Sequence, residues 1–187
     1  NGARDPSFLP VTGEDFNATT LALQPDGKIL VGAQSFFSTA PNLLRLNADG
    51  SRDRAFNAIP LRGVNAIVVQ IDGAIVVGGP FVTYNGAPRS HVVRLTAAGA
   101  FELAYNSGAP PDFQTNALAL QPNGQVVAGG WFLNVESSVR SALARLTTSG
   151  EIDPAFAGDV RSPGMVEALV RQPDGKLLFG GSFDYVN

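Results

Sequence analysis

The stretch Leu-Gln-Pro-Asp-Gly-Lys-Ile-Leu-Val-Gly, residues 23–32, decides the architecture of this chain of 187 residues, because the chain contains four versions of it. The stretch returns at residues 69–78, 120–129 and 170–180. The turn glycines of the four copies step by 46, 51 and 51 residues, and they are Gly27, Gly73, Gly124 and Gly175. A fixed period of this length is typical of repeat proteins, in which each unit packs against the next.

Three further markers recur in the same order. A Gly-Gly pair ends the second, third and fourth copies, at residues 78–79, 129–130 and 180–181. An Arg-Leu pair follows at residues 45–46, 94–95 and 145–146. An Asp-x-x-Phe motif begins at Asp5, Asp53 and Asp153, with Glu102 and Tyr105 as its divergent member. Because four markers recur in one order, the chain contains a true sequence repeat and not a chance similarity.

Each unit predicts four short strands joined by tight turns. In the first complete unit these are Thr20–Gln24, Lys28–Gly32, Leu43–Leu46 and Ser51–Phe56. Proline, aspartate and glycine in the first turn supply a preset φ, a side chain that caps its own backbone, and a positive φ. Two hairpins in about 50 residues predict a blade, so we expect an all-β, propeller-type array of four-stranded antiparallel blades. No helix is predicted, because Gly or Pro interrupts every window with helical spacing.

The boundaries predict a single repeat domain over residues 1–187 with about four blades. Residues 1–16 form the tail of a blade; three blades follow at 17–63, 64–114 and 115–164, and residues 165–187 form the first half of a blade. A blade split across the two ends would lack its third strand. Three alternatives stay open: closure with a three-stranded blade, a fragment of a longer array, which we favour, or strand addition from a neighbouring molecule.

The repeated phrase, followed by Arg-Leu-Asn-Ala-Asp-Gly-Ser-Arg-Asp-x-x-Phe over residues 45–56, resembles the delta-60 repeat of bacterial β-propeller proteins. The resemblance covers essentially the whole chain. It implies a propeller in a large bacterial protein of the secreted or surface-attached kind, and it implies no catalytic residues. A similar strand followed by Gly-Gly also occurs in kelch blades. A shared fold does not by itself define a function.

Composition excludes several classes of partner. The net charge is −3 and no basic cluster occurs, so we expect no nucleic-acid binding. No apolar run reaches the roughly 18 residues that a membrane-spanning helix needs. The chain contains no cysteine, which excludes disulfides and thiolate metal sites. We expect a secreted or surface protein.

Recurring polar residues have a structural and a functional interpretation. A glutamine precedes each turn. These glutamines could form a ring of polar ligands around a central axis, but we expect each one to hydrogen-bond to backbone next to its turn. Aspartate or asparagine inside each turn, at Asp26, Asp72, Asn123 and Asp174, could suggest a metal ring, but we expect turn capping and no metal site. We expect the repeated arginines to pair with Asp53 and Asp153.

Aromatic residues fall into two groups. Phe36, Phe81, Phe132 and Phe183 recur after the glycine pair, and their regular step predicts a packing position between blades. Four others lie in the variable loops that follow, where binding residues collect on rigid scaffolds. These candidate ligand-binding residues are Phe37, Tyr84, Trp131 and Tyr185. Ordinary half-buried loop aromatics are the alternative interpretation.

His91 is the only histidine, and no nucleophile elbow or phosphate loop accompanies it. We therefore expect no catalytic residues, no cofactor and no enzyme. The first hypothesis is a non-enzymatic extracellular binding or structural module, a segment or subunit of a larger surface or filamentous assembly whose partners include copies of itself. The alternative is a carbohydrate-binding propeller that uses the loop aromatics.

Overall fold

The structure is a computed structural model. It describes residues 3, 5–8, 17–34, 42–57, 61–84, 87–88, 91–105, 114–131, 134–135, 138–139, 142–156 and 164–183. For residues 83–84, 87–88, 134–135 and 138–139 it describes the backbone only. All sheets in these ranges are antiparallel, and none of these residues is helical.

Four sheets follow one another along the chain, and we name them blades 1 to 4 after their strands. Blade 1 contains β1 (Ala18–Leu23), β2 (Ile29–Ala33) and β3 (Leu43–Leu46). Blade 2 contains β4 (Ala66–Val69), β5 (Ile75–Gly78) and β8 (Val92–Leu95). Blade 3 contains β9 (Thr115–Leu120), β10 (Val126–Gly130) and β13 (Leu143–Leu146). Blade 4 contains β14 (Met165–Arg171) and β15 (Leu177–Ser182).

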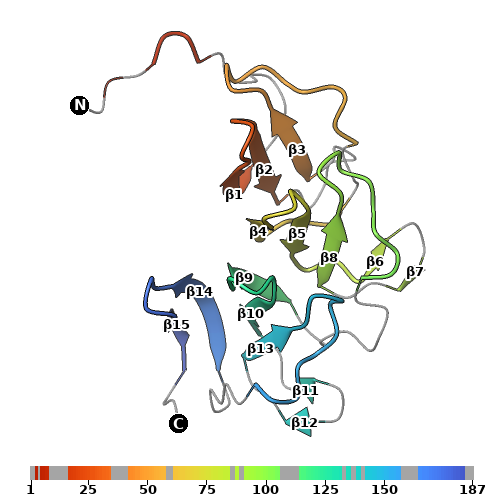
Figure 1. Cartoon of the computed structure of the whole chain (residues 1–187), viewed down its shortest axis with the longest axis vertical. Coiled ribbons are helices and arrows are strands. Elements are labelled where there is room, and N and C mark those ends of the chain that lie inside the picture. Colours follow the sequence, from red (N-terminus) through yellow and green to blue (C-terminus); the bar gives the residue numbers. More distant parts are fainter. Residues whose placement is uncertain are drawn as a thin grey trace.

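Two small hairpins lie in the loops between the second and third strands of blades 2 and 3. The first pairs β6 (Thr83–Tyr84) with β7 (Ala87–Pro88), and the second pairs β11 (Asn134–Val135) with β12 (Ser138–Val139). Both project from the same side of the array in Figure 1. They turn the variable loops of these two blades into short appendages outside the main sheets.

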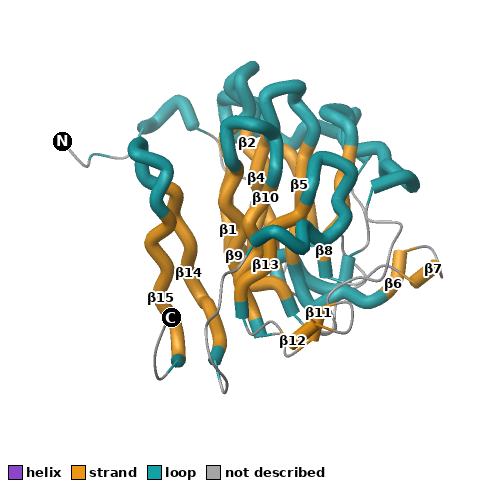
Figure 2. The backbone as a smooth tube through the Cα atoms, turned by 60° about the horizontal axis from the view of Figure 1, so that its bottom comes forward, coloured by secondary structure: helices purple, strands orange, loops and turns teal. Residues whose placement is uncertain are grey.

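The blades are arranged in an arc, with their first strands side by side. Strand β4 neighbours β1, β9 neighbours β4, and β14 neighbours β9 (Figure 1). The turned view in Figure 2 shows β1, β4 and β9 close together, with the hairpin of β14 and β15 beside them at the left. The prediction of an all-β array of small antiparallel sheets is therefore confirmed.

Local turn chemistry explains the first hairpin of each blade. Gly27 has φ 83°, and its N–H donates to the Gln24 carbonyl at 3.0 Å. The Asp26 carboxylate accepts the N–H of Lys28 at 3.1 Å, which closes the corner. The same side-chain bond is made by Asp72, Asn123 and Asp174 in the other blades. The predicted turn role of these residues is confirmed.

The structure differs from the sequence-based expectation at the fourth strand. Residues 51–56 make a single β-bridge, from Arg52 to Leu46, and the main sheets of blades 1 to 3 have three strands. The reason is local, because the Asp53 carboxylate accepts the N–H of Ala55 at 3.0 Å and its carbonyl accepts the N–H of Phe56. These bonds bend the chain into a turn directly after the bridge.

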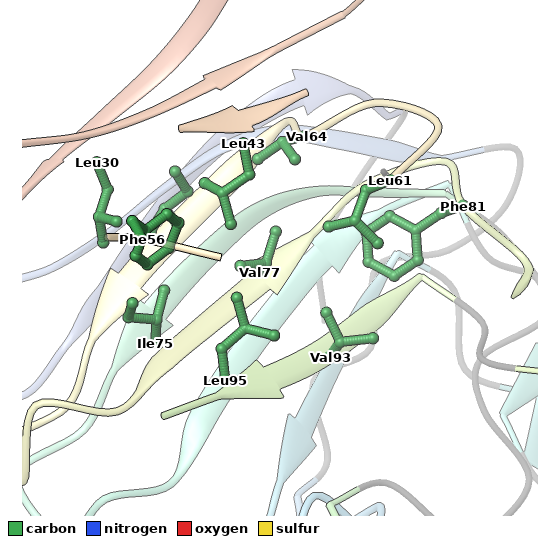
Figure 3. Close-up of a cluster of buried hydrophobic side chains, with 11 residues drawn as sticks. Leu30, Leu43, Phe56, Leu61, Val64, Ile75, Val77, Phe81, Val93 and Leu95 are labelled. Carbon is green, nitrogen blue, oxygen red and sulfur yellow. The ribbon is translucent and has the colours of Figure 1, made fainter. Parts of the chain in front are cut away.

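The hydrophobic core lies in the junctions between blades. In the junction of blades 1 and 2, Leu30 and Leu43 from one sheet face Ile75 and Val77 from the other (Figure 3). Phe81 is fully buried in this cluster, so its predicted position between blades is confirmed. Phe183 is partly buried against the corresponding cluster of blades 3 and 4. Phe36 and Phe132 lie outside the described residues.

Candidate functional site

The repeated arginine, acid and aromatic residues form one cluster in each of blades 1 to 3. Arg45 Nε donates to Asp53 at 2.9 Å, and its guanidinium lies 4.6 Å from the centre of the Phe56 ring. Equivalent ion pairs join Arg94 to Glu102 and Arg145 to Asp153. Equivalent aromatic contacts are made by Tyr105 and Phe156. The predicted pairing of these arginines is therefore confirmed.

The repeated glutamine makes a hydrogen bond to the arginine of its own cluster and, in blade 2, a second one to the next blade. Gln24 and Gln70 accept hydrogen bonds from Arg45 and Arg94, at 3.3 and 2.7 Å. Gln70 also donates to the carbonyl of Gly124, in the turn of blade 3. Its backbone partner is thus the neighbouring blade's turn, whereas the sequence had suggested its own turn.

In blades 1 and 3, the residue that follows the turn glycine donates a further hydrogen bond to the acidic residue of the cluster. Lys28 Nζ donates to Asp53 Oδ2 at 2.8 Å, and Gln125 does the same for Asp153 at 3.1 Å. The hydrogen bond from Lys28 is the main reason that the pKa of Asp53 is lowered to about 2, with Ala55 N–H and Arg45 contributing. The carboxylate is therefore charged in the folded protein except in strong acid.

A second series of hydrogen bonds joins the first strands of neighbouring blades. Asn65 donates to the carbonyl of Thr115 at 3.0 Å, and Asn116 donates to the carbonyl of Val166 at 3.4 Å. Thr19, at the same position in blade 1, donates to Val64. Blade 4 has Glu167 here, and a carboxylate has no proton to donate when it is ionised.

A glycine at the end of each second strand lets the next blade approach. A Cβ built on Gly78 would lie 2.6 Å from Thr115, and one on Gly129 would lie 2.6 Å from Val166. The equivalent Gly180 in blade 4 has no atom within 4 Å of such a Cβ among the described residues. Among the described residues, nothing therefore fills at blade 4 the position where the other blades receive a neighbour.

The two end faces of the array expose residues that the internal junctions bury. Leu21 in blade 1 is 66% exposed, whereas its equivalents Ile67, Leu118 and Leu169 are 8%, 8% and 9% exposed. On the opposite face of blade 4, Leu178 is 55% exposed, although Val76 and its other equivalents are fully buried. Val170 on that face is 61% exposed. These two faces are the largest departures from the repeat's own pattern of burial.

One of the predicted ligand-binding aromatics borders a cavity. Trp131 is 52% exposed, and with Gly164, Met165 and Ser182 it lines a cavity of about 340 Å³ beside blade 4. Tyr84 lies in β6, where its backbone pairs with Ala87. The side chain of Tyr84 and all of Phe37 and Tyr185 lie outside what the structure describes.

The remaining candidates have structural surroundings. His91 is buried with φ 67°, and its Nδ1 lies 3.1 Å from the carbonyl of Gly79. No group of three or more acidic or histidine side chains within the described ranges is arranged to hold a metal ion. The described part of the chain also contains no helix that is long and apolar enough to cross a membrane.

Sequence reasoning missed the polar position of the first strands that donates hydrogen bonds to the next blade. Thr19, Asn65, Asn116 and Glu167 differ in residue type, so they do not stand out as a motif. The signal available was the recurrence of Asn65 and Asn116 at the period of the repeat. The close approach at the second-strand glycines was also missed, although the glycine pairs themselves were noticed.

Radially stacked blades with repeated junction clusters define a β-propeller repeat protein. The chain belongs to the family described as "Domain of unknown function (DUF5122) beta-propeller", whose model matches residues 24–56, 70–103, 121–156 and 172–187, more than half of the chain. No curated protein matches the chain.

Several solved structures are similar to the chain at low sequence identity. The chain is similar to a chain described as the extracellular domain of a hybrid two component system from B. thetaiotaomicron, with a TM-score of 0.56, 14% identity, and coverage of 93% of this chain and 20% of that one. The chain is also similar to a protein of unknown function from Bacteroides caccae, with a TM-score of 0.53 and 11% identity. The match covers 89% of this chain and 54% of that one. For virginiamycin B lyase from Staphylococcus aureus the TM-score is 0.49 and the identity is 17%. The match covers 91% of this chain and 65% of that one. The chain thus spans a fifth of the first structure and about half of the second.

Proposed function

We propose that this chain is a non-enzymatic, extracellular β-propeller module of the delta-60 type, which joins a larger surface or filamentous assembly through its end faces. The partner at these faces is a second copy of the chain, stacked head to tail. The observation that carries the proposal is the contrast between the end faces and the internal junctions. Burying a leucine side chain contributes about 1.5–3 kcal/mol, so the exposed leucines favour association.

The repeat itself supplies the complementarity between copies. The face of blade 4 that carries Leu178 is equivalent to the face of blade 3 that receives blade 4. The face of blade 1 that carries Leu21 is equivalent to the face that blade 4 presents to blade 3. A copy placed with its blade 1 against blade 4 would repeat the part of the internal junctions that the first and second strands make.

Two observations support the absence of catalysis and the extracellular location. The recurring polar side chains, such as Arg45 and Gln70, are engaged in bonds that hold the junctions. The similar structure from B. thetaiotaomicron is described as an extracellular domain, and we propose secretion or surface attachment for this chain too.

Replacing Gly180 by valine tests the assembly. Because the space around Gly180 is open, Gly180→Val should fold like the wild-type chain, but the added side chain should block a second copy at the distance seen for Gly78. Light scattering across a concentration series should show a wild-type mass rising above 19.5 kDa and a variant mass that stays there.

The internal counterpart provides the control. Gly78→Val places a side chain 2.6 Å from Thr115 inside a junction and should lower the free energy of unfolding. A wild-type chain that stays at 19.5 kDa up to its solubility limit would refute self-assembly. Equal association of Gly180→Val and wild type would refute the proposed face.

A second candidate function is carbohydrate binding at the cavity beside Trp131. Its volume of about 340 Å³ lies within the range of small-ligand sites, and an exposed indole ring stacks well on a sugar face. Because Trp131 is the only tryptophan, its fluorescence reports on this cavity alone. Titration with oligosaccharides should shift the emission saturably. The Met165→Lys variant should weaken that response, and an unchanged spectrum with every sugar tested would exclude this function.

A further inference from the structure

The junction of blades 1 and 2 is closed by a hydrogen bond that the junction of blades 2 and 3 lacks. Arg45 donates at 2.6 Å to the carbonyl of Ala97, in the turn that follows β8. The equivalent residues one repeat later are Arg94 and Thr148. Arg94 instead bonds three side chains of its own blade, which are those of Gln70, Asp72 and Glu102. Within the described part of the chain, Arg94 therefore leaves the carbonyl of Thr148 without this bond.

A cavity of about 490 Å³ lies between the two blades at this point, with Arg94 on one side and Thr148 on the other. Its lining also includes Glu102, Leu103, Ala104 and Tyr105 from blade 2. The cavity at the equivalent residues of blade 1 measures about 230 Å³, and its lining residues, 52–54 and 56, all belong to blade 1. The larger cavity has the size of a small-molecule site.

The charges around this cavity favour a cation. The Arg94 guanidinium pairs with two carboxylates, those of Asp72 and Glu102, so one positive and two negative charges leave one net negative charge. In blade 1 the acid of the cluster has a second cationic partner, Lys28, whereas blade 2 has Ala74 at this position. An alanine side chain has no proton to donate. The cluster of blade 2 is therefore short of one cation.

The walls of the cavity provide apolar surface next to this charge. Leu103 is 67% exposed, although it stands where blade 1 has Arg54 and blade 3 has Pro154. Ala104 beside it is also exposed. A ligand that covers these side chains gains about 25 cal/mol for each Å² of apolar surface that it removes from water. The site thus combines an excess of negative charge with an uncovered apolar wall.

We propose that this cavity binds a small organic cation, in which an amidine, guanidine or primary amine is attached to an apolar body. The N–H groups of the cation donate to the Glu102 carboxylate and to the carbonyl of Thr148, as the Arg45 guanidinium donates to Ala97 in the preceding junction. The apolar body lies against Leu103. Charge-assisted hydrogen bonds orient the ligand, and the apolar contact adds affinity. The site lies in an internal junction, so it is independent of the end faces through which we propose that the chain assembles.

Benzamidine is a suitable probe, because two molecules of nearly the same shape differ from it in charge. Added to the ¹⁵N-labelled chain, it should shift the backbone amide signals of residues 102–105 and 147–150 saturably. Benzamide, which is neutral, should bind about tenfold more weakly, and benzoate, which is negative, should not bind. Shifts spread evenly over the chain, or benzoate binding as tightly as benzamidine, would overturn the proposal.

Removing the charge of Glu102 tests its role as the partner of the cation. Glu102→Gln should weaken benzamidine binding about tenfold, because the variant keeps the shape of the side chain but loses its charge. Asp26→Asn removes a carboxylate from an exposed turn of blade 1 and should leave the affinity unchanged. Equal affinities of the two variants would show that the charge of Glu102 does not hold the ligand.

Filling the cavity tests its location independently of charge. Ala104 is exposed, so Ala104→Phe should fold like the wild-type chain while its ring occupies the cavity and abolishes benzamidine binding. Ala55 is the equivalent exposed residue of blade 1, and Ala55→Phe should bind benzamidine like the wild-type chain. Thermal unfolding of both variants verifies that they are folded. Undiminished binding by folded Ala104→Phe would refute the site.

Discussion

At the scale of single residues, Arg45 connects two parts of its own blade with the blade that follows. Arg45 bonds the acid that lies eight residues later, stacks on the Phe56 ring and donates to the carbonyl of Ala97 in the next blade. A cation over an aromatic ring contributes about 0.5–2 kcal/mol, depending on how well it is shielded from water. Markers that are separate in the sequence are therefore one cluster in the molecule.

The charge of Asp53 predicts a loss of stability in acid. Its pKa is lowered in the folded state, from the usual 3.8 to about 2, so it stabilises the fold fully above pH 4 and loses this effect as pH falls toward 2. Thermal unfolding between pH 7 and 2 should show the difference between wild type and Asp53→Asn disappearing over that interval. Asp26→Asn, at an exposed turn, is the control, and a difference that stays constant with pH would contradict the prediction.

Tyr105 carries a buried hydroxyl where the other copies of the motif have phenylalanine. The hydroxyl has no hydrogen-bond partner among the described residues, and burial raises the pKa of Tyr105 to about 12. An unsatisfied buried polar group costs about 1–3 kcal/mol, so Tyr105→Phe should raise the free energy of unfolding by about 1 kcal/mol. Denaturant unfolding measures this, with Phe56→Tyr as the reverse change. A less stable Tyr105→Phe variant would show that the hydroxyl has a partner.

At the scale of elements, the sequence predicted the strands that local turns determine. Strand β3 has the predicted bounds, Leu43–Leu46, and β1 and β2 are shifted by one or two residues. The turn between them is specified by neighbouring residues, which sequence patterns capture well. The segment after Ser51 was harder to predict, because two hydrogen bonds accepted by Asp53, one at its side chain and one at its carbonyl, bend it away from the sheet.

The candidate binding residues show where such reasoning stops. The sequence identified Trp131 as a loop aromatic, but only the fold places it beside Met165 and Ser182, which come from the next blade. Residues brought together across a junction share no local pattern. The polar position of the first strands was missed for a related reason, since Thr19, Asn65 and Asn116 share a hydrogen-bonding role but not a residue type.

At the scale of the whole molecule, the junctions repeat in one direction. The side chains of Asn65, Gln70 and Asn116 all donate to backbone carbonyls of the following blade. Arg45 and Thr19 do the same from blade 1. The face that donates and the face that accepts are therefore different surfaces on opposite sides of every blade.

This polarity restricts the symmetry that any assembly of the chain can have. A twofold dimer places identical patches against each other, so it cannot repeat the contact between unlike faces that the internal junctions make. Copies that join through unlike faces instead form a closed ring or an unbounded helical filament, depending on the rotation between successive units. In the proposed head-to-tail stacking, the rotation from one copy to the next would therefore decide between a ring and a fibre.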